Sequence, residues 1–412
     1  MNGNDTDCIY LDYAKAFDKV DHALLIKKLE KYGVHHQVIR WIESFLRDRT
    51  QQVVVDGQMS LAALIMSGVP QGTVLGPILF LIFINDITDC ITNSTIRCFA
   101  DDTRISKAIS CEHDVSILQS DLDLVIQWSM KNNMTLHEDK FEYICHSASK
   151  SNSLCQLPFV SECYQYNTST SSLAPVSQLR DLGVTVSPDL SWSLNIRSIC
   201  DKARQKAAWV LSVFHTRSPA IMLTLYKSMV RSLVEYCSPL WNPSKISDIQ
   251  ELESIQKSFT ARIAGCQNLD YWERLNKLSL MSLQRRRERF IICYMWKILH
   301  GHTSNDLAIQ FHTRSRTGTQ AIVPSLNKSS SIGHQSMYDK SFAMIGPRLW
   351  NAVPYRLNSI DQFEPFKIQL TRFLLTVPDK PPARGYHPTN SNSLLAWRVD
   401  SSAAALWGGQ RR

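Results

Sequence analysis

The sequence predicts an α+β fold, with an antiparallel sheet and packed helices followed by a mostly helical region. Three observations support this class. Short apolar runs of strand length occur at residues 8–11 and on both sides of Asp101-Asp102. Apolar residues with helical spacing lie between these runs. From residue 195 the chain changes to long, basic helical patterns.

The composition is that of a globular protein with one basic region. Of the 412 residues, 44% are hydrophobic and 20% are charged, which excludes a disordered chain. The net charge is +8, and residues 197–297 alone hold 17 Lys/Arg against 8 Asp/Glu. A basic region joined to a near-neutral one indicates either a polyanionic partner or a solvated helical surface.

Cysteine usage and the apolar runs indicate the compartment. The 11 cysteines form no C-x-x-C pair, which argues against a disulfide framework and a structural zinc site. The first residues are polar and carry no signal peptide, and the longest apolar run, residues 78–84, is far shorter than the ~20 residues of a membrane helix. We therefore expect an intracellular protein of the nucleus or cytoplasm that is not secreted and has no membrane partner.

The first predicted strand, residues 8–11, ends at Asp12. A carboxylate at the end of a buried strand is suited to bind a metal ion, and Asp12 is equally suited to cap a following helix. Helical spacing then runs to Gly33, where a glycine stops it, and resumes over residues 38–46.

Turn residues organise the next segment. Asp56-Gly57 separates two strand-like runs and predicts a hairpin over residues 51–61. Residues 68–77 contain three glycines and two prolines, so we expect an ordered loop that leads into a buried helix at 78–87. Glycines let a backbone approach a ligand closely, which suits a nucleotide or a template base.

Asp101 and Asp102 stand between the strand-like runs 95–100 and 104–109. At the turn of a hairpin, both side chains can point out of the sheet edge. Adjacent carboxylates repel each other unless a cation lies between their oxygens, so the pair is either an exposed turn or a metal site.

The remaining pattern predicts a helix at 114–132, a strand at 141–145, and a polar, loosely ordered insertion at 147–177. Basic helical patterns cover residues 195–214, 219–235, 246–264 and 281–300. With a boundary near residue 190, we expect three regions: residues 1–190, residues 191–300, and residues 301–412 with a compact segment at 340–378 and a disordered tail after it.

Three stretches occur in a fixed order: residues 11–22 (LDYAKAFDKVDH), 68–77 (GVPQGTVLGP) and 99–102 (FADD). Together they resemble the palm motifs of reverse transcriptases, specifically those of non-LTR (LINE-type) retrotransposons. The resemblance covers nearly the whole chain and is firmest over residues 8–190. It implies a polymerase palm, followed by a helical, thumb-like region and a C-terminal region.

The resemblance implies an RNA-directed DNA polymerase that uses two Mg²⁺ ions, with Mn²⁺ as a substitute. A primer 3′-hydroxyl attacks the α-phosphate of a deoxynucleotide, and two ions about 4 Å apart activate the hydroxyl and stabilise the departing pyrophosphate. Asp12 and Asp101 would be the principal ligands, and Asp102 a weaker or structural third. The partners would be an RNA template, a DNA primer and deoxynucleoside triphosphates.

Further residues take roles from the same resemblance. The ring of Phe17 would lie under the incoming sugar and exclude a ribose 2′-hydroxyl, unless it is a core residue, and Ala16 would leave room beside it. Gln71 and Gly72 would touch the nucleotide and the template. Lys140 would act as a general acid near the pyrophosphate, with a surface lysine as the alternative.

The basic helices after residue 195 would hold the template–primer duplex by its phosphates, as a thumb does. The nucleic-acid backbone contacts would include Arg285, Arg286 and Arg287. A hairpin with Leu182, Gly183 and Val184 resembles the element that holds the primer.

The chain departs from the family in what stands before Asp12. Only eleven residues precede it, so we expect the fingers region and an endonuclease domain to be missing. We therefore keep a second hypothesis of a different class, a catalytically silent nucleic-acid-binding remnant of a retrotransposon reading frame. The sequence leaves the oligomeric state open.

Overall fold

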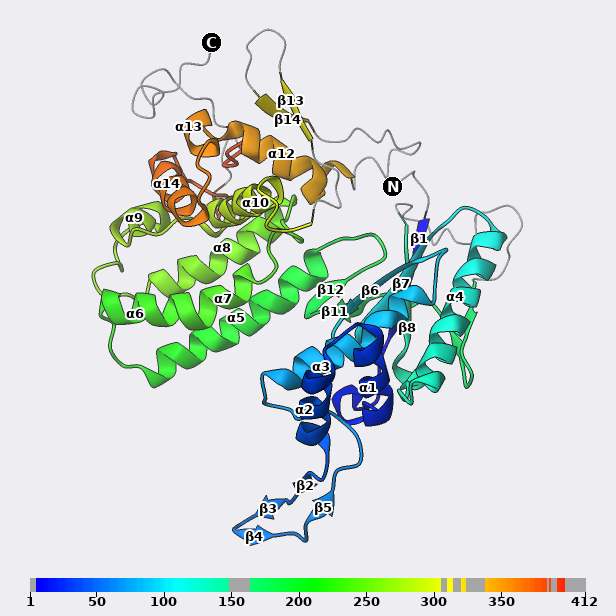
Figure 1. The fold of residues 1–412 in the computed structure, drawn as a ribbon. Coiled ribbons are helices and arrows are strands. Elements are labelled where there is room, and N and C mark those ends of the chain that lie inside the picture. The colour runs from blue at the N-terminus through cyan, green and yellow to red at the C-terminus, as the bar shows by residue number, and fades with distance from the viewer. Residues whose placement is uncertain are drawn as a thin grey trace. The chain divides into compact units, whose positions relative to one another are not determined.

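The structure is a computed structural model that describes residues 5–147, 164–304, 310–313, 320–323, 338–383, 385–386 and 391–396. The chain divides between Leu179 and Arg180 into two compact units (Figure 1). The predicted boundary near residue 190 lies inside the second unit, because Val184 before it belongs to the same hydrophobic core as the helices after it.

The first unit is built on a four-stranded antiparallel sheet in the order β6-β7-β1-β8. Its strands are β1 (Asp5–Leu11), β6 (Thr95–Phe99), β7 (Asp102–Ile109) and β8 (Glu142–His146). The central strand β1 is apolar because its side chains are buried, and both Ile9 and Leu11 lie in the core. The sheet and its helices confirm the predicted α+β class.

Four helices complete this core: α1 (His22–Lys31), α2 (His36–Leu46), α3 (Leu75–Ile84) and α4 (Glu112–Lys131). Helix α1 begins at Asp21, whose side chain accepts a hydrogen bond from Leu24 N at 2.9 Å. It ends just before Gly33, which has φ 75° and stops the helix as predicted. Short 3₁₀ turns are η1 (Ala16–Asp18), η2 (Asn85–Asp89) and η3 (Glu138–Lys140).

A thin arm projects from the first unit between α2 and α3 (Figure 1). Asp56 and Gly57 form its turn with φ 49° and 81°, as a two-residue hairpin requires, so this prediction is confirmed. Every residue from 50 to 64 is exposed. The paired strands are β2 (Thr50–Gln51) with β5 (Ala63–Leu64), and β3 (Val54–Val55) with β4 (Gln58–Met59).

The predicted loosely ordered insertion is wrong for residues 164–177. They carry the paired strands β9 (Tyr166–Asn167) and β10 (Ser172–Leu173). Tyr166 is fully buried, its ring lies edge-on to that of Tyr143 at 4.8 Å, and its hydroxyl donates to Asp7 at 2.7 Å. Leu173 is also in the core, so two buried side chains hold this polar stretch, which composition does not reveal. Residues 148–163 lie outside the described part.

The second unit begins with a tight hairpin and continues as helices, and it confirms the four basic helices. The π-helical turn η5 (Tyr226–Val230) joins α6 to α7, and α9 is a helix that the sequence pattern does not predict. The elements are β11 (Leu179–Asp181), β12 (Val184–Val186), α5 (Ser193–Val213), α6 (Pro219–Leu225), α7 (Arg231–Glu235), α8 (Ile246–Thr260), α9 (Tyr271–Lys277) and α10 (Leu283–Leu299).

The compact segment near the C-terminus packs on α10 around Trp296, Trp350 and Phe366. Its helices are α12 (Phe342–Ala352), α13 (Tyr355–Asn358) and α14 (Phe363–Thr376), and a separate pair of strands is β13 (Gln310–Thr313) with β14 (Gln320–Val323). Among the described residues, no helix has the length and apolar character needed to cross a membrane.

The predicted disordered tail is wrong for residues 379–383 and 391–396. Asp379 accepts hydrogen bonds from both the backbone N and the hydroxyl of Ser282 at 2.7 Å, at the start of α10. Leu394 is fully buried, and its N donates to Glu288 at 3.0 Å. The tail is ordered there because it satisfies a helix N-terminus and a buried carboxylate.

Candidate active site

Strands β1 and β7 bring two carboxylates to one edge of the sheet. Their antiparallel register ends with Leu11 paired to Thr103. The next residue on β1's side is Asp12, and the residue before Thr103 is Asp102. Residues that face each other across antiparallel strands share one face of the sheet, so this register favours the approach of the two side chains.

The hairpin that carries the acidic pair turns one residue earlier than predicted. Ala100 adopts φ 54° and forms the turn together with Asp101, while Phe99 pairs with Asp102. Asp101 therefore lies at the tip of the hairpin, and Asp102 is the first residue of β7. The two side chains are placed by different local geometry, one by a turn and the other by a strand.

Lys140 lies beside Asp12. Its Nζ is 2.9 Å from Asp12 Oδ2, and the side chains are 60% and 32% exposed, so the pair faces solvent. The backbone supports this approach, because His137 N donates to the carbonyl oxygen of Asp12 at 2.9 Å. The turn η3 then carries the chain from His137 to Lys140. Two predicted site residues, 128 positions apart, are thus brought together.

Phe17 and Ala16 pack into the protein to different degrees. The Phe17 ring stacks on Phe80 of α3, with centroids 4.4 Å apart and planes at 17°. It is partly exposed, so one side of the ring remains accessible. Ala16 is buried in the core, and its predicted role of leaving room beside the Phe17 ring stays a prediction.

The glycine-rich loop runs directly alongside the segment that follows Asp12. Val69 N donates to Phe17 O at 2.9 Å, and Gly68 N donates to Val20 O at 2.8 Å. Gly68 has φ 89°, and a Cβ there would lie 2.7 Å from Asp18 Cα, so only glycine fits. Two of the three motifs therefore form one backbone-paired structure.

Gln71 and Gly72 follow in an exposed turn. Gln71 Nε2 donates to Asp18 Oδ1 at 2.9 Å. Gly72 has φ 77° and open space around its Cα, which leaves its backbone accessible. Contact of these two residues with a nucleotide stays a prediction.

Two residues that sequence reasoning missed hold this loop in place. Arg49 Nη2 donates to the carbonyl oxygen of Gly68 at 2.6 Å, and His22 Nε2 lies 2.9 Å from the same oxygen. His22 is the last residue of the first motif, LDYAKAFDKVDH, so its position in the motif could have identified it as a site residue. Arg49 stands outside every motif, and no sequence feature marks it.

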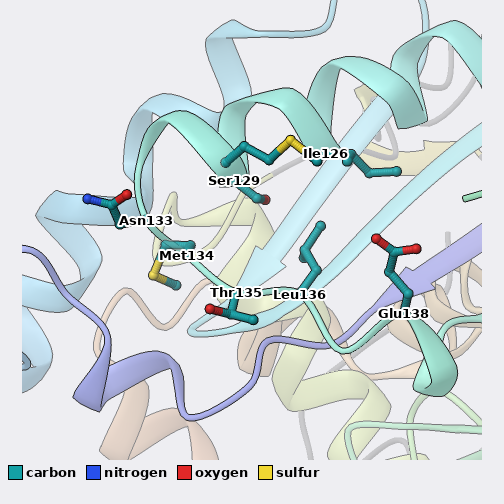
Figure 2. A pocket seen from close by; sticks show the side chains of 8 residues that line it. Ile126, Ser129, Asn133, Met134, Thr135, Leu136 and Glu138 are labelled. Carbon is teal, nitrogen blue, oxygen red and sulfur yellow. The ribbon is translucent and has the colours of Figure 1, made fainter. Parts of the chain in front are cut away.

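A pocket of about 450 Å³ lies between α4 and the segment that follows it (Figure 2). One wall is the C-terminal part of α4, and the other is the segment that leads to Lys140. That segment also pairs with the chain after Asp12, since Ala14 N donates to Thr135 O at 2.9 Å. The pocket is lined by Ile126, Ser129, Met130, Asn133, Met134, Thr135, Leu136 and Glu138.

In the second unit, the predicted primer-holding residues form the β11–β12 turn. Leu182 and Gly183 have φ 45° and 86°, and Tyr236 donates its hydroxyl hydrogen to Leu182 O at 2.9 Å. Leu182 is exposed and accessible to a ligand. Val184 is only 3% exposed and belongs to the core, so its predicted contact with the primer is wrong.

The predicted backbone contacts of the arginine run are wrong for Arg285 and Arg287. Each is only 1% exposed. Arg285 donates to Glu288 at 2.9 Å and to two carbonyl oxygens of the tail, and Arg287 donates to Asn242 Oδ1 at 3.3 Å. Arg286 is paired with Glu235. These three guanidinium groups are paired with groups of the second unit, and two of them are buried there.

The carboxylates at the sheet edge fit hard divalent cations by their chemistry. Mg²⁺ prefers carboxylate oxygens and in polymerase sites is bound by one or two of them together with substrate phosphates and water. Asp12 Oδ2 accepts a hydrogen bond from the Lys140 ammonium at 2.9 Å. In the part of the chain that the structure describes, no group of three Asp, Glu, His or Cys side chains forms a ready metal cluster. If such ions bind at this edge, Asp12 and the Asp101-Asp102 hairpin would hold them with substrate phosphates and water as the other ligands.

This chain is similar in sequence or fold to several known proteins. The family described as reverse transcriptase (RNA-dependent DNA polymerase) matches residues 2–186. The RNA-directed DNA polymerase from the mobile element jockey of Drosophila melanogaster is 28% identical over 276 residues, which cover 62% of this chain and 28% of that protein. A probable RNA-directed DNA polymerase from the transposon X-element of the same species is 26% identical, over 63% of this chain and 28% of that protein. An apo telomerase structure from Candida tropicalis has a TM-score of 0.37 and 12% identity over 69% of this chain and 45% of that chain.

The chain thus spans 28% of the length of these two Drosophila polymerases. The matched residues 2–186 contain the whole sheet edge, with Asp12, the Asp101-Asp102 hairpin and Lys140, and the glycine-rich loop beside it. The ordered motifs and the two Drosophila relatives agree with this match, and residues 2–186 resemble the reverse transcriptases of non-LTR (LINE-type) retrotransposons.

Proposed function

We propose that the chain acts as an RNA-directed DNA polymerase that extends a DNA primer on an RNA template with deoxynucleoside triphosphates. One observation supports this most directly. Asp12 with its Lys140 partner stands where β1 ends, next to the Asp101-Asp102 hairpin that opens β7. Three segments far apart in the sequence therefore supply acidic and basic groups to one edge of the sheet.

Each residue at this edge has a role in nucleotidyl transfer. Asp12, Asp101 and Asp102 would hold two Mg²⁺ ions, or Mn²⁺ in their place, and these ions would supply the positive charge that activates a primer hydroxyl and stabilises a leaving group. Lys140 carries a proton beside Asp12 and donates it to the departing pyrophosphate. Phe17, held against Phe80, presents a ring edge that excludes a ribose 2′-hydroxyl.

We assign the contacts with the nucleic-acid backbone to the exposed face of α5 instead of the buried arginines. Lys202, Lys206 and Trp209 follow one another at helical spacing on this face. Trp209 is 46% exposed, and Lys206 Nζ lies 5.0 Å from its ring centroid. Ammonium groups bind phosphates without regard to sequence, and an exposed indole offers a stacking surface for a base.

Primer extension by the full chain on an RNA homopolymer with an annealed DNA primer tests the proposal. Asp101→Asn should abolish extension, because an amide replaces a charged ligand. Asp56→Asn at the tip of the arm is the matched control, since it removes the same charge at a remote position whose φ of 49° suits asparagine. Extension that survives both Asp12→Asn and Asp101→Asn would contradict the site.

The same assay separates the silent remnant from the polymerase. A chain that extends no primer but binds RNA–DNA hybrid with a steep salt dependence would support the remnant. A chain that does neither would contradict both functions.

A further inference from the structure

Asp18 and Gln71 meet across two motifs at the surface of the first unit. Gln71 Nε2 donates to Asp18 Oδ1 at 2.9 Å, and both residues are exposed. Asp18 is the last residue of η1, directly after the Phe17 ring, and Gln71 stands at the turn of the glycine-rich loop. The contact therefore connects the segment under the proposed nucleotide site with the loop beside it.

The chemistry of the pair decides which end of the Gln71 amide faces Asp18. An ionised carboxylate has only acceptor atoms, so it can bind only the NH₂ end of a primary amide. Because the amide is planar, its carbonyl Oε1 then points away from Asp18. A ligand approaching Gln71 from that side meets an acceptor. A phosphate there would also meet the negative charge of Asp18 nearby.

The backbone around this pair is held without the Asp18 side chain. Ser67 Oγ donates to the backbone oxygen of Asp18 at 2.8 Å, and Gly68 is paired with Val20. Arg49 holds the Gly68 carbonyl from the other side. Removing the Asp18 carboxylate should therefore free the Gln71 amide while the loop keeps its path, which makes the side chain's role separable from folding.

We propose that Asp18 is a positioning residue for Gln71, and that the site presents Gln71 Oε1 to a hydrogen-bond donor of the bound nucleotide or template base, a hydroxyl or an exocyclic amine. This assignment rests on the proposed polymerase function for its ligand. The orientation of the amide rests on the Asp18–Gln71 contact alone.

The first test observes the side-chain resonance of the Gln71 amide in the full chain. With ¹⁵N-glutamine labelling, the Gln71 side-chain resonance is identified by its loss in Gln71→Ala. Asp18→Asn should shift this resonance, since an asparagine can face the amide with either end. Asp21→Ala is the matched control: Asp21 caps α1 in the same segment, so its loss should lower the melting temperature and leave the Gln71 resonance unchanged.

The second test measures the kinetics of nucleotide incorporation. In single-nucleotide extension, Asp18→Asn should raise KM for the deoxynucleotide about 3- to 10-fold, the size of one net hydrogen bond, with kcat changed less than about twofold. Asp18→Asn in a Gln71→Ala background should add nothing, because the two residues act as one unit.

The outcomes separate the inference from the function on which it rests. A Gln71 resonance that is unchanged in Asp18→Asn overturns the inference, whatever the extension assay gives. Additive KM effects of the two substitutions overturn it as well. A shifted resonance in a chain that extends no primer supports the positioning role and counts against the polymerase proposal alone.

Discussion

Lys140 and Asp12 form an ion pair across the open edge of the sheet, with Nζ 2.9 Å from Oδ2. The lysine arrives from the turn η3 and the aspartate from the end of β1. A solvent-facing pair of this kind contributes only about 0–1 kcal/mol to folding. The pair therefore contributes little to folding, and the proposed roles of Lys140 as a proton donor and of Asp12 as a metal ligand depend on its position at the end of β1.

Lys140→Ala should reduce kcat for primer extension by roughly 100-fold or more, the range for loss of a general acid, and change the unfolding free energy by less than about 1 kcal/mol. Lys107→Ala is the control, because Lys107 forms an ion pair with Asp114 in the same unit at 3.6 Å. Rapid-quench kinetics and urea unfolding measure the two quantities. Equal kinetic losses in both variants would remove the special role of Lys140.

Phe17→Val should raise the ratio of ribonucleotide to deoxynucleotide incorporation, because the smaller side chain no longer blocks a 2′-hydroxyl. The lost stacking on Phe80 should also cost about 1–3 kcal/mol of stability. The ratio is measured by competition on one template, so partial unfolding affects both substrates equally. An unchanged ratio would leave Phe17 as a core residue only.

Lys202→Ala combined with Lys206→Ala should weaken hybrid binding and reduce the slope of log K against log salt by about 1–2, because two phosphate contacts are lost. Arg287→Met should leave that slope unchanged and alter stability, since the guanidinium is buried beside Asn242. Fluorescence anisotropy over a salt series measures the slope. A slope that falls in Arg287→Met and stays unchanged in the double lysine variant would place the phosphate contacts on the arginine run.

Glu253 gives the second unit a stability that depends on pH. It is fully buried, and burial raises the pKa of its carboxyl to about 7. Between about pH 4.5 and 7 the folded chain holds a proton that the unfolded chain has lost, so this contribution falls as pH rises and is gone above about 7. The change should amount to at most about 3 kcal/mol.

Glu253→Gln should therefore make the free energy of unfolding, measured in urea from pH 5 to 8, less dependent on pH. Glu251→Gln, on the same helix but paired with Arg204 at the surface, should keep the slope of the wild type. A Glu253→Gln chain that still loses stability over this range would show that another buried group titrates there.

Leu394→Ala should destabilise the second unit by about 2–5 kcal/mol, as expected for a fully buried leucine. Leu395→Ala is the neighbouring control, because Leu395 is 44% exposed and should change stability by less than about 0.5 kcal/mol. Thermal unfolding followed by circular dichroism distinguishes them. Equal effects would mean that the ordered tail contributes little to the core.

Helices and turns were predictable where the signal is local. Gly33 ends α1, and Asp56-Gly57 makes a hairpin turn, because φ preferences act on neighbouring residues. The hairpin tip at Asp101 was displaced by one residue, since Ala100 takes a positive φ that its side chain does not favour. Arg49 was missed because its partner, the Gly68 carbonyl, is a backbone atom without a sequence signature.

The amino-acid order alone determined the family, the succession of its motifs and the class of the fold, because each of these rests on residues adjacent in the chain. Tertiary structure decided which charges are available for binding. Arg285 donates to the carbonyl of Asn392, 107 positions away, and Asp12 is paired with Lys140. Burial and pairing depend on such distant partners, whose approach no local pattern encodes.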